Sequence, residues 1–500
     1  MKNWPEWRLY SQGIGTISRR DFLCRTCNGI GALALANVLA EDLGADTAMT
    51  NPLAPKAQHI PRKAKHCIFI FMAGGASQLD TFDYKPALQK YANQPLPKLP
   101  GLSGEIEGFL NAPHRAIPSP FEFKKCGHSG RYVSTLFPHL AECVDDMAFV
   151  YGIKVDNNNH GPATMHVNTG SQLQGSPSIG SWISYGLGSP NQNLPAYVVI
   201  QDPRGAPVNG GAVWGNGYLP ASYQGTLFRS SGTPILDLDL PEGLSRQQQR
   251  KEFDLLKWLN DQHREERPGA SDLEARINAY ELAYRMQAEA PEIVDLSKES
   301  EQTRKLYGLD NPLTEGFGRQ CLLARRLVEK GVRYNLLIHG VEISKYSWDD
   351  HGNVKERMPY HAVEVDQPVA GLLKDLKLRG LLDETLVVWA SEMGRTPFIN
   401  DLKSDKPGRD HNQWGLVMWL AGGDVKGGTT AGETDEFGIR ALGEPIPLRD
   451  VHATILDLMG LSDERLTYLH AGRFRKLTDI GGKVLTEILA NSGTHLKVST

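Results

Sequence analysis

Short apolar runs recur along the chain and predict buried β-strands. The first is 67–72, in which β-branched and aromatic residues follow one another without a polar break. Five later runs have the same character: 147–151, 196–200, 334–338, 386–390 and 416–420. Continuous apolar runs of this length are typical of strands that are covered on both faces.

Segments of mixed polarity separate these strands and predict helices. We expect helices over 131–143, 160–169, 319–329, 361–379 and 451–459. A charged segment near 245–290 is also predicted to be helical and to form a solvated excursion. The alternation of strands and helices indicates an α/β fold, with a mostly parallel central sheet that helices cover on both faces.

The first residues of the chain have a different pattern. Arg19 and Arg20 precede a Phe-Leu pair, and a weakly apolar stretch follows at 29–40. This order of charged, apolar and small residues is typical of a twin-arginine signal peptide, and Val38-Leu39-Ala40 fits its cleavage site. The alternative is a buried core helix that follows a chance pair of arginines. The apolar stretch is shorter than the roughly 20 residues that span a bilayer.

These features predict the organisation of the whole chain. We assign 1–48 to the signal peptide, 49–65 to a Pro-containing linker and 66–490 to a single domain. The twin-arginine export machinery is therefore an expected partner, and the expected location is periplasmic or extracellular. No stable membrane span is expected after cleavage.

Composition narrows the choice of partners. The chain has 500 residues, of which 40% are hydrophobic and 22% charged, which is ordinary for a globular protein. A net charge of −4 gives no reason to expect nucleic acid as a partner. The four cysteines beyond the signal segment lack the spacing of a disulfide framework or a cysteine-zinc site, and Cys67 is predicted to be a buried thiol.

Acidic and histidine residues gather near the ends of the predicted strands. Asp80 comes shortly after the first strand, and Glu392 directly follows the strand at 386–390. Trp-Asp-Asp-His at 348–351 and Gly-Arg-Asp-His at 408–411 lie in two further loops. Because ligands of open parallel sheets bind at the carboxyl ends of the strands, we expect a site for Zn, Mn, Fe or Ca there. Taken singly, such an Asp usually caps a helix or turn, and such a His usually packs or faces solvent.

Six motifs in this order carry a resemblance to a known family. They are GGASQLDTFDYKP (74–86), HGPATMHVNTG (160–170), WDDHGN (348–353), TLVVWASEMGRTP (385–397), GRDHNQWG (408–415) and LAGGDVKGG (420–428). From about residue 65 to near the C-terminus, the chain resembles the exported bacterial family called domain of unknown function 1501. That family is similar to the alkaline phosphatase and sulfatase superfamily, so the resemblance implies that superfamily's fold.

The resemblance also implies two groups of metal ligands. Asp80 and Glu392 match the acids that hold the ion beside the nucleophile. Asp349, His351 and His411 match the ligands of a second ion. A methionine follows Glu392 where phosphatases place a further ligand, so the chain is expected to bind either one or two divalent ions.

The position of the nucleophile departs from the superfamily pattern. Related enzymes place Ser, Thr or Cys at the start of the helix that ends in Thr-Gly, where this chain has His160. A formylglycine sulfatase needs Cys or Ser followed by x-Pro-x-Arg, and only Pro162 matches. His160 is therefore a candidate ligand, nucleophile or base, and Thr164 is a weaker catalytic candidate. Arg395 suits an oxyanion partner, since its planar fork matches phosphate or sulfate.

Three functions remain open from the sequence. The leading hypothesis is an exported metal-dependent hydrolase of a phosphate or sulfate ester, acting on a small-molecule or glycan substrate. The alternative is a non-catalytic metal- or glycan-binding protein of the cell surface, which the missing nucleophile favours and the ligand set opposes. A lyase or transferase on the same scaffold is the third.

Overall fold

The computed structural model describes most of the chain beyond residue 50. The described residues are 51–99, 104–230, 234–235, 240, 243–267, 271–341 and 345–491. The predicted signal peptide, with Arg19, Arg20 and the stretch at 29–40, lies outside them. Among the described helices, none combines the length and apolar character that a membrane crossing requires.

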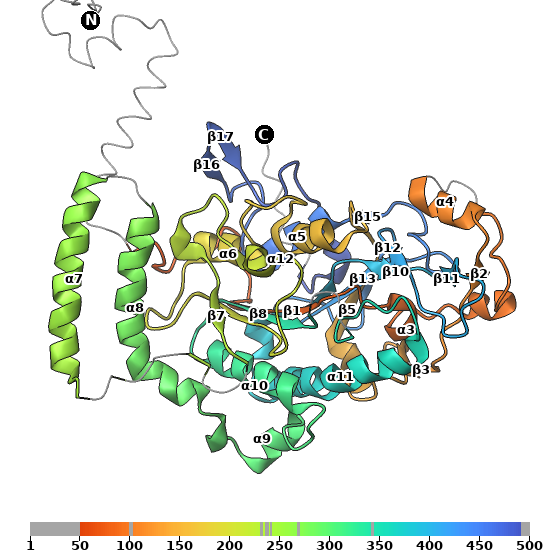
Figure 1. Ribbon diagram of the computed structural model, residues 1–500, viewed down its shortest axis with the longest axis horizontal. Helices are drawn as coiled ribbons and strands as arrows, with labels where there is room; N and C mark the ends of the chain where they lie inside the picture. The colour runs from red at the N-terminus through yellow and green to blue at the C-terminus, as the bar shows by residue number, and fades with distance from the viewer. Residues whose placement is uncertain are drawn as a thin grey trace, which may run out of the picture. The chain divides into compact units, whose positions relative to one another are not determined.

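A nine-stranded sheet forms the centre of the described part of the chain (Figure 1). Its order is β14-β5-β13-β9-β1-β8-β6-β7, and β15 pairs with β5. The strands are β1 (His66–Met72), β5 (Met147–Lys154), β6 (Tyr197–Ile200), β7 (Thr226–Phe228), β8 (Tyr334–His339), β9 (Thr385–Ser391), β13 (Leu416–Ala421), β14 (Thr430–Ala431) and β15 (Ile446–Pro447). All pairings are parallel except those of β13 with β5 and β9, which confirms the predicted mostly parallel sheet.

Helices cover both faces of the sheet, as predicted. One face packs against α5 (His160–Thr169), α6 (Ile179–Leu187) and α12 (Leu448–Leu458). The other packs against α10 (Glu315–Glu329) and α11 (Val354–Leu378). Alternate residues of β1 divide between these two cores, because successive strand side chains point to opposite faces. Cys67 is fully buried with a free thiol, as predicted.

The charged segment near 245–290 forms the helices α7 (Arg246–Glu266) and α8 (Ser271–Val294). α8 packs through Met286, Ala290 and Ile293 against β6 and α10. Figure 1 shows α7 beside α8, on the side away from the sheet. The predicted excursion is therefore helical, but only α7 is largely solvated.

Two segments differ from the predictions. The helix predicted at 131–143 is wrong in its first part, because Arg131–Ser134 forms strand β4, which pairs with β3 (Phe123–Cys126). Its end is helical, as a 3-10 helix over Leu140–Asp146. The turn between β3 and β4 uses Gly127 and Gly130 at positive φ, where glycine is tolerated best. The linker predicted at 49–65 packs against the domain from residue 52 onward, with Ala64 fully buried and Arg62 paired with Asp457.

Short elements complete the described part of the chain. They are α3 (Gln78–Thr81), α4 (Gly104–Asn111), α9 (Glu301–Leu306), β2 (Arg115–Ala116), β10 (Gly394–Arg395), β11 (Phe398–Ile399), β12 (His411–Asn412), β16 (Tyr468–His470) and β17 (Arg473–Arg475).

The strand directions bring four loops to one edge of the sheet. Met72 pairs with His339 and Ser391, so β1, β8 and β9 end side by side. β13 runs antiparallel to β9, so it begins at the edge where the other three end. The loops that follow β1, β8 and β9 therefore meet the loop that precedes β13.

Candidate metal centre

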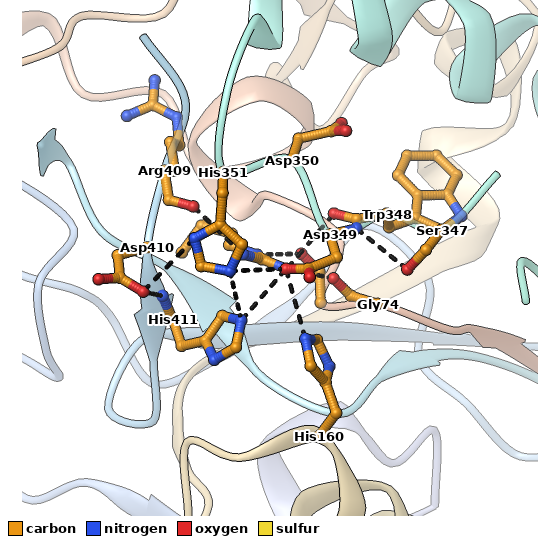
Figure 2. Close-up of polar contacts among 12 residues, drawn as sticks. Gly74, His160, Ser347, Trp348, Asp349, Asp350, His351, Arg409, Asp410 and His411 are labelled. Carbon is orange, nitrogen blue, oxygen red and sulfur yellow. Dashed lines mark hydrogen bonds and ion pairs between the residues drawn. The ribbon is translucent and has the colours of Figure 1, made fainter. Parts of the chain in front are cut away.

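Three histidines and one aspartate converge at this edge (Figure 2). His160 begins α5, Asp349 and His351 lie in the loop after β8, and His411 lies in β12. Asp349 Oδ1 lies 3.3 Å from His160 Nε2, 3.0 Å from His351 Nε2 and 3.1 Å from His411 Nε2. His411 stands before a strand rather than after one, because β13 is antiparallel. These four predicted residues come together although distant segments supply them.

More nitrogen atoms surround Asp349 Oδ1 than this oxygen can accept hydrogen bonds from. Besides the three imidazoles, Arg395 donates to Asp349 Oδ1 at 2.6 Å. One carboxylate oxygen has two lone pairs, yet it faces four nitrogens. The two Nε2 atoms of His351 and His411 lie only 2.9 Å apart, so they cannot both carry protons toward each other. A cation between the imidazoles would resolve this crowding.

Hydrogen bonds hold His160 and His411 at their other nitrogen, and an acidic oxygen lies near that of His351. His160 Nδ1 lies 2.8 Å from Glu392 Oε1, and His411 Nδ1 lies 2.6 Å from the carbonyl oxygen of Asn158. His351 Nδ1 lies 3.6 Å from Asp410 Oδ1. Metal-bound histidines usually donate their second N–H to such an oxygen, which fixes the free nitrogen. All three rings therefore present Nε2 to the same point.

The distances fit a small divalent ion. Ligand atoms of a tetrahedral zinc, each about 2.0–2.2 Å from the ion, lie roughly 3.3–3.5 Å apart. The separations given above, 2.9–3.3 Å, are slightly shorter. His160, Asp349 and His411 form one group with metal-ligand proximity, and His351, Asp410 and His411 form a second. The two groups share His411, so a single ion or a closely spaced pair fits the residues.

The charges at the centre favour a cation. Burial lowers the pKa of His160, but its contacts with the Asp349 and Glu392 carboxylates outweigh burial and raise the pKa to about 9. Burial opposes ionisation of Asp349, yet the three histidines and Arg395 hold the pKa of its carboxyl far below the usual value. Carboxylates that stabilise a proton on an imidazole also stabilise a metal ion in its place.

Glu392 contacts Nδ1 of His160, on the side of the ring away from the point where the Nε2 atoms meet. Its side chain is 1% exposed and accepts from the backbone N–H of Gly74 at 2.7 Å. The same oxygen, Oε1, faces His160 Nδ1. Glu392 is thus placed to orient His160. Met393, which follows it, is fully buried in the core beneath the sheet edge.

Asp80 and Arg395 are each engaged by other groups of the chain. Asp80 is fully buried, and Arg409 donates to both of its oxygens at 2.6 and 3.0 Å. Arg395 is 1% exposed and donates to the carbonyl oxygens of Gly74, Gly75 and Arg409 as well as to Asp349. Both side chains therefore hold loops together, and the Arg395 guanidinium is already engaged instead of free for an oxyanion.

Close backbone approach at Gly74 allows this geometry. Its φ is +114°, and a Cβ there would lie 2.1 Å from Ser347 Oγ and 2.6 Å from the Trp348 nitrogen. A side chain would push the loop after β1 away from the loop that carries Asp349. The glycine is required because the two loops touch at this point.

A small cavity adjoins the buried side of the centre. It has a volume of about 10 Å³, room for about one water molecule. His160, Thr164, Ser347 and Glu392 contribute polar side chains to its wall. Thr164 is 1% exposed. Its predicted catalytic role is thus compatible with its place beside His160.

Two residues of the centre were not among the predicted site residues. Asp410 lies 40% exposed beside His351, which is 48% exposed, so this is the side that solvent reaches. Asp410 stands next to His411 in GRDHNQWG, and an acid beside a ligand was a usable sequence clue. Asn158 contributes only a backbone carbonyl, which no residue type could have revealed.

Comparison with known proteins identifies the family. The profile described as "Protein of unknown function (DUF1501)" matches residues 64–489. The chain belongs to the DUF1501 family. This confirms the family to which the sequence motifs pointed. No curated protein matches the chain.

Solved structures that match this DUF1501 chain include several hydrolases. A sulfatase from Pseudoalteromonas sp. is 13% identical, over 81% of this chain and 69% of that one, with a TM-score of 0.31. A phosphonate monoester hydrolase from Silicibacter pomeroyi is 12% identical, over 71% and 72%, with a TM-score of 0.33. A variant of TAB5 alkaline phosphatase is 10% identical, over 80% and 100%, with a TM-score of 0.33. Because these identities and TM-scores are low, the structures carry no argument about function. The function proposed below therefore rests on the side chains of this chain.

Proposed function

We propose that this DUF1501 protein is an exported, metal-dependent hydrolase of a phosphate or sulfate ester, acting on a small molecule or a glycan. The observation that carries the proposal is the convergence of three imidazole Nε2 atoms on Asp349 Oδ1, with an oxygen behind each ring. The ligands are His160, Asp349, His351 and His411. This arrangement supports metal binding more directly than any single motif does.

The donor set indicates which metal the centre prefers. Three imidazoles and one carboxylate suit Zn²⁺ or Fe²⁺, and they also accept Mn²⁺. Ca²⁺ prefers six to eight oxygen ligands, which these residues do not offer. A divalent ion held there, with a coordination position beyond the protein ligands, would polarise an ester oxygen and favour deprotonation of a water or hydroxyl beside it.

The chain's own residues would position the substrate. His160 stands at the N-terminus of α5, whose dipole favours an anionic group nearby. Solvent reaches the centre from the side of His351 and Asp410. With His160 engaged as a ligand, the attacking group is either a water molecule or the hydroxyl of Thr164, which lines the adjoining cavity.

The second candidate function is a non-catalytic metalloprotein that binds glycans at the cell surface. The observation that favours it is the engagement of Arg395 by backbone carbonyls and Asp349. A hydrolase of anionic esters commonly uses an arginine for substrate charge, and this one is occupied. Turnover therefore has to be tested separately from metal binding.

Metal analysis combined with ester hydrolysis separates the two functions. The purified chain should contain one to two divalent ions, and it should hydrolyse p-nitrophenyl phosphate, its diester or p-nitrophenyl sulfate. Asp349→Asn should lose both properties, because its oxygen faces all three imidazoles. His128→Ala, at an exposed histidine, is the matched control and should keep both. Metal without turnover on any ester would support the non-catalytic protein, and a chain that binds no metal would refute both.

Export is the remaining part of the proposal, and it concerns residues outside the described ones. Arg19 and Arg20 carry it, since the twin-arginine route depends on that pair. Replacing both by Lys should leave the protein inside the cell without changing its unfolding midpoint. Fractionation of cells that express each form measures this. Unchanged export of the Lys-Lys form would contradict the twin-arginine route.

A further inference from the structure

The helix α7 carries its apolar side chains on the face opposite to the one it packs with. Leu255, Leu256, Trp258 and Leu259 are 57%, 41%, 58% and 45% exposed. A surface helix normally turns its apolar stripe toward the core and its polar residues toward water. These four residues, called the α7 face below, therefore face solvent at positions where polar residues are expected.

The inward side of α7 is polar. Gln249 and Asn260 are buried, at 8% and 7% exposure, and Arg276 of α8 donates to the Asn260 side chain at 3.1 Å. Arg250 bridges Asp254 and Glu281, which fastens α7 to α8 through charge. Phe253 and Tyr284 add one aromatic contact. The helix is thus held to α8 mostly by polar contacts, while the four residues of the α7 face remain exposed.

Nothing in the described part of the chain covers the α7 face. Figure 1 shows α7 as the outermost helix at one end, with α8 between it and the sheet. Four neighbouring large apolar side chains exceed the scattered exposure that is normal for a surface. Such a cluster is typical of a protein interface, whose buried centre is more apolar than the rest of the surface and is enriched in aromatic residues such as Trp258.

The charges around the α7 face indicate which partner fits. Lys251 and Glu252 lie one turn before it, and His263 and Glu266 lie one to two turns after it, all exposed. In an antiparallel pair of α7 helices centred near residue 258, Lys251 of one copy approaches Glu266 of the other. Glu252 likewise approaches His263. A parallel pair would instead place like charges together.

We propose that two copies of this chain associate through α7, antiparallel about a two-fold axis, with the α7 face at the centre. A two-fold interface must be complementary to itself, and the order of charge, apolar face and opposite charge meets that requirement. One helix contributes less than a standard interface of about 1,600 Å². The dimer therefore forms at roughly micromolar concentration and is in equilibrium with the monomer. This inference is independent of the proposed hydrolase activity.

Sedimentation velocity on the full chain tests the dimer. Between about 1 and 100 μM, a range that brackets a micromolar Kd, the wild type should pass from monomer to dimer. Leu255→Glu with Leu259→Glu should weaken association about tenfold or more, because two charges replace its apolar centre. Leu378→Glu, at a leucine that is 81% exposed on α11, is the matched control and should leave association unchanged. A wild type that stays monomeric throughout would overturn the proposal.

Charge exchange distinguishes the antiparallel pair from other contacts. Lys251→Glu and Glu266→Lys should each weaken the dimer, because each places like charges opposite one another. The two changes together should restore it. Failure of the double variant to regain association, or a dimer that survives Leu255→Glu with Leu259→Glu, would show that the copies meet elsewhere or that a different partner covers α7. Circular dichroism melting confirms that each variant is folded.

Discussion

At the scale of single residues, the candidate centre depends on which nitrogen each imidazole presents. Glu392 lies against Nδ1 of His160, and a backbone carbonyl lies against Nδ1 of His411. These contacts leave Nε2 of both rings directed at Asp349. His160 therefore has the geometry of a ligand, although the superfamily that the sequence motifs resemble places its nucleophile at that position.

The first prediction separates a ligand from the residue that orients it. His160→Ala should lose bound metal together with any ester hydrolysis, because it removes a nitrogen from the centre. Glu392→Gln should keep the metal but lower its affinity about 10- to 100-fold, the usual cost of losing a carboxylate behind a metal-bound histidine. Competition against a chromogenic chelator measures both affinities. Retained metal with abolished hydrolysis in His160→Ala would make His160 the nucleophile or base.

Sequence motifs could name most residues of the centre but not their contacts. His160, Asp349, His351 and His411 lie close together, because the loops that carry them meet at one sheet edge. The pairing of Asp80 with Arg409 could not be read from the sequence, because 329 positions separate them. Local spacing cannot tell a buried carboxylate that binds arginine from one that binds metal.

At the scale of elements, two buried arginines fix the loops that carry the centre. Arg395 joins the loops after β1 and β8, and Arg409 joins α3 to the loop before β13. The six longer strands of the sheet were predictable from continuous apolar runs, whereas the short strands β7, β14 and β15 were not. The segment at 131–143 was not, because its glycine turn lies just before the residues that were assigned to a helix.

The second prediction concerns the Asp80–Arg409 pair. Asp80→Asn leaves a buried guanidinium without its counter-ion, so the metal-free protein should lose about 3–5 kcal/mol of its free energy of unfolding. Urea denaturation after metal removal measures the change. Glu384→Gln breaks the exposed Lys65 pair and should cost only about 0–1 kcal/mol. If Asp80→Asn instead lowered metal affinity and left metal-free stability intact, Asp80 would be the ligand that the family resemblance implies.

At the scale of the whole molecule, buried histidines outside the centre link folding to pH. Burial is the main cause that lowers the pKa of His452 to about 3, and nearby His166 adds to it against the hydrogen bond to Val167. Burial likewise lowers the pKa of His66 to about 4, with Arg333 adding to it and the Val332 carbonyl opposing it. Both rings are therefore neutral in the folded protein at pH values where unfolded histidine, with a pKa near 6.5, is protonated.

The third prediction follows from the sign of these shifts. Because the folded pKa values are depressed, their stabilisation is fully present above about pH 6.5 and is lost as the pH falls toward 4 and then 3. Each histidine contributes a slope of at most about 1.4 kcal/mol per pH unit in that range. Urea midpoints of the metal-free protein, measured from pH 6.5 to 5, should therefore fall with acidity, because in this range the raised pKa of His160 leaves that ring protonated in both states.

Substitution of one of these histidines isolates its share of the slope. His452→Gln keeps a donor that can reach the Val167 carbonyl but cannot titrate, so the fall in stability below pH 6.5 should become shallower. The exposed His128 provides the control, since His128→Gln removes a histidine that is in water in both states. An unchanged slope in His452→Gln would mean that the ring is already protonated in the folded protein, and that water reaches it. The folded protein would then resist acid because water hydrates the buried helix α12, and not because protons are kept away from that helix.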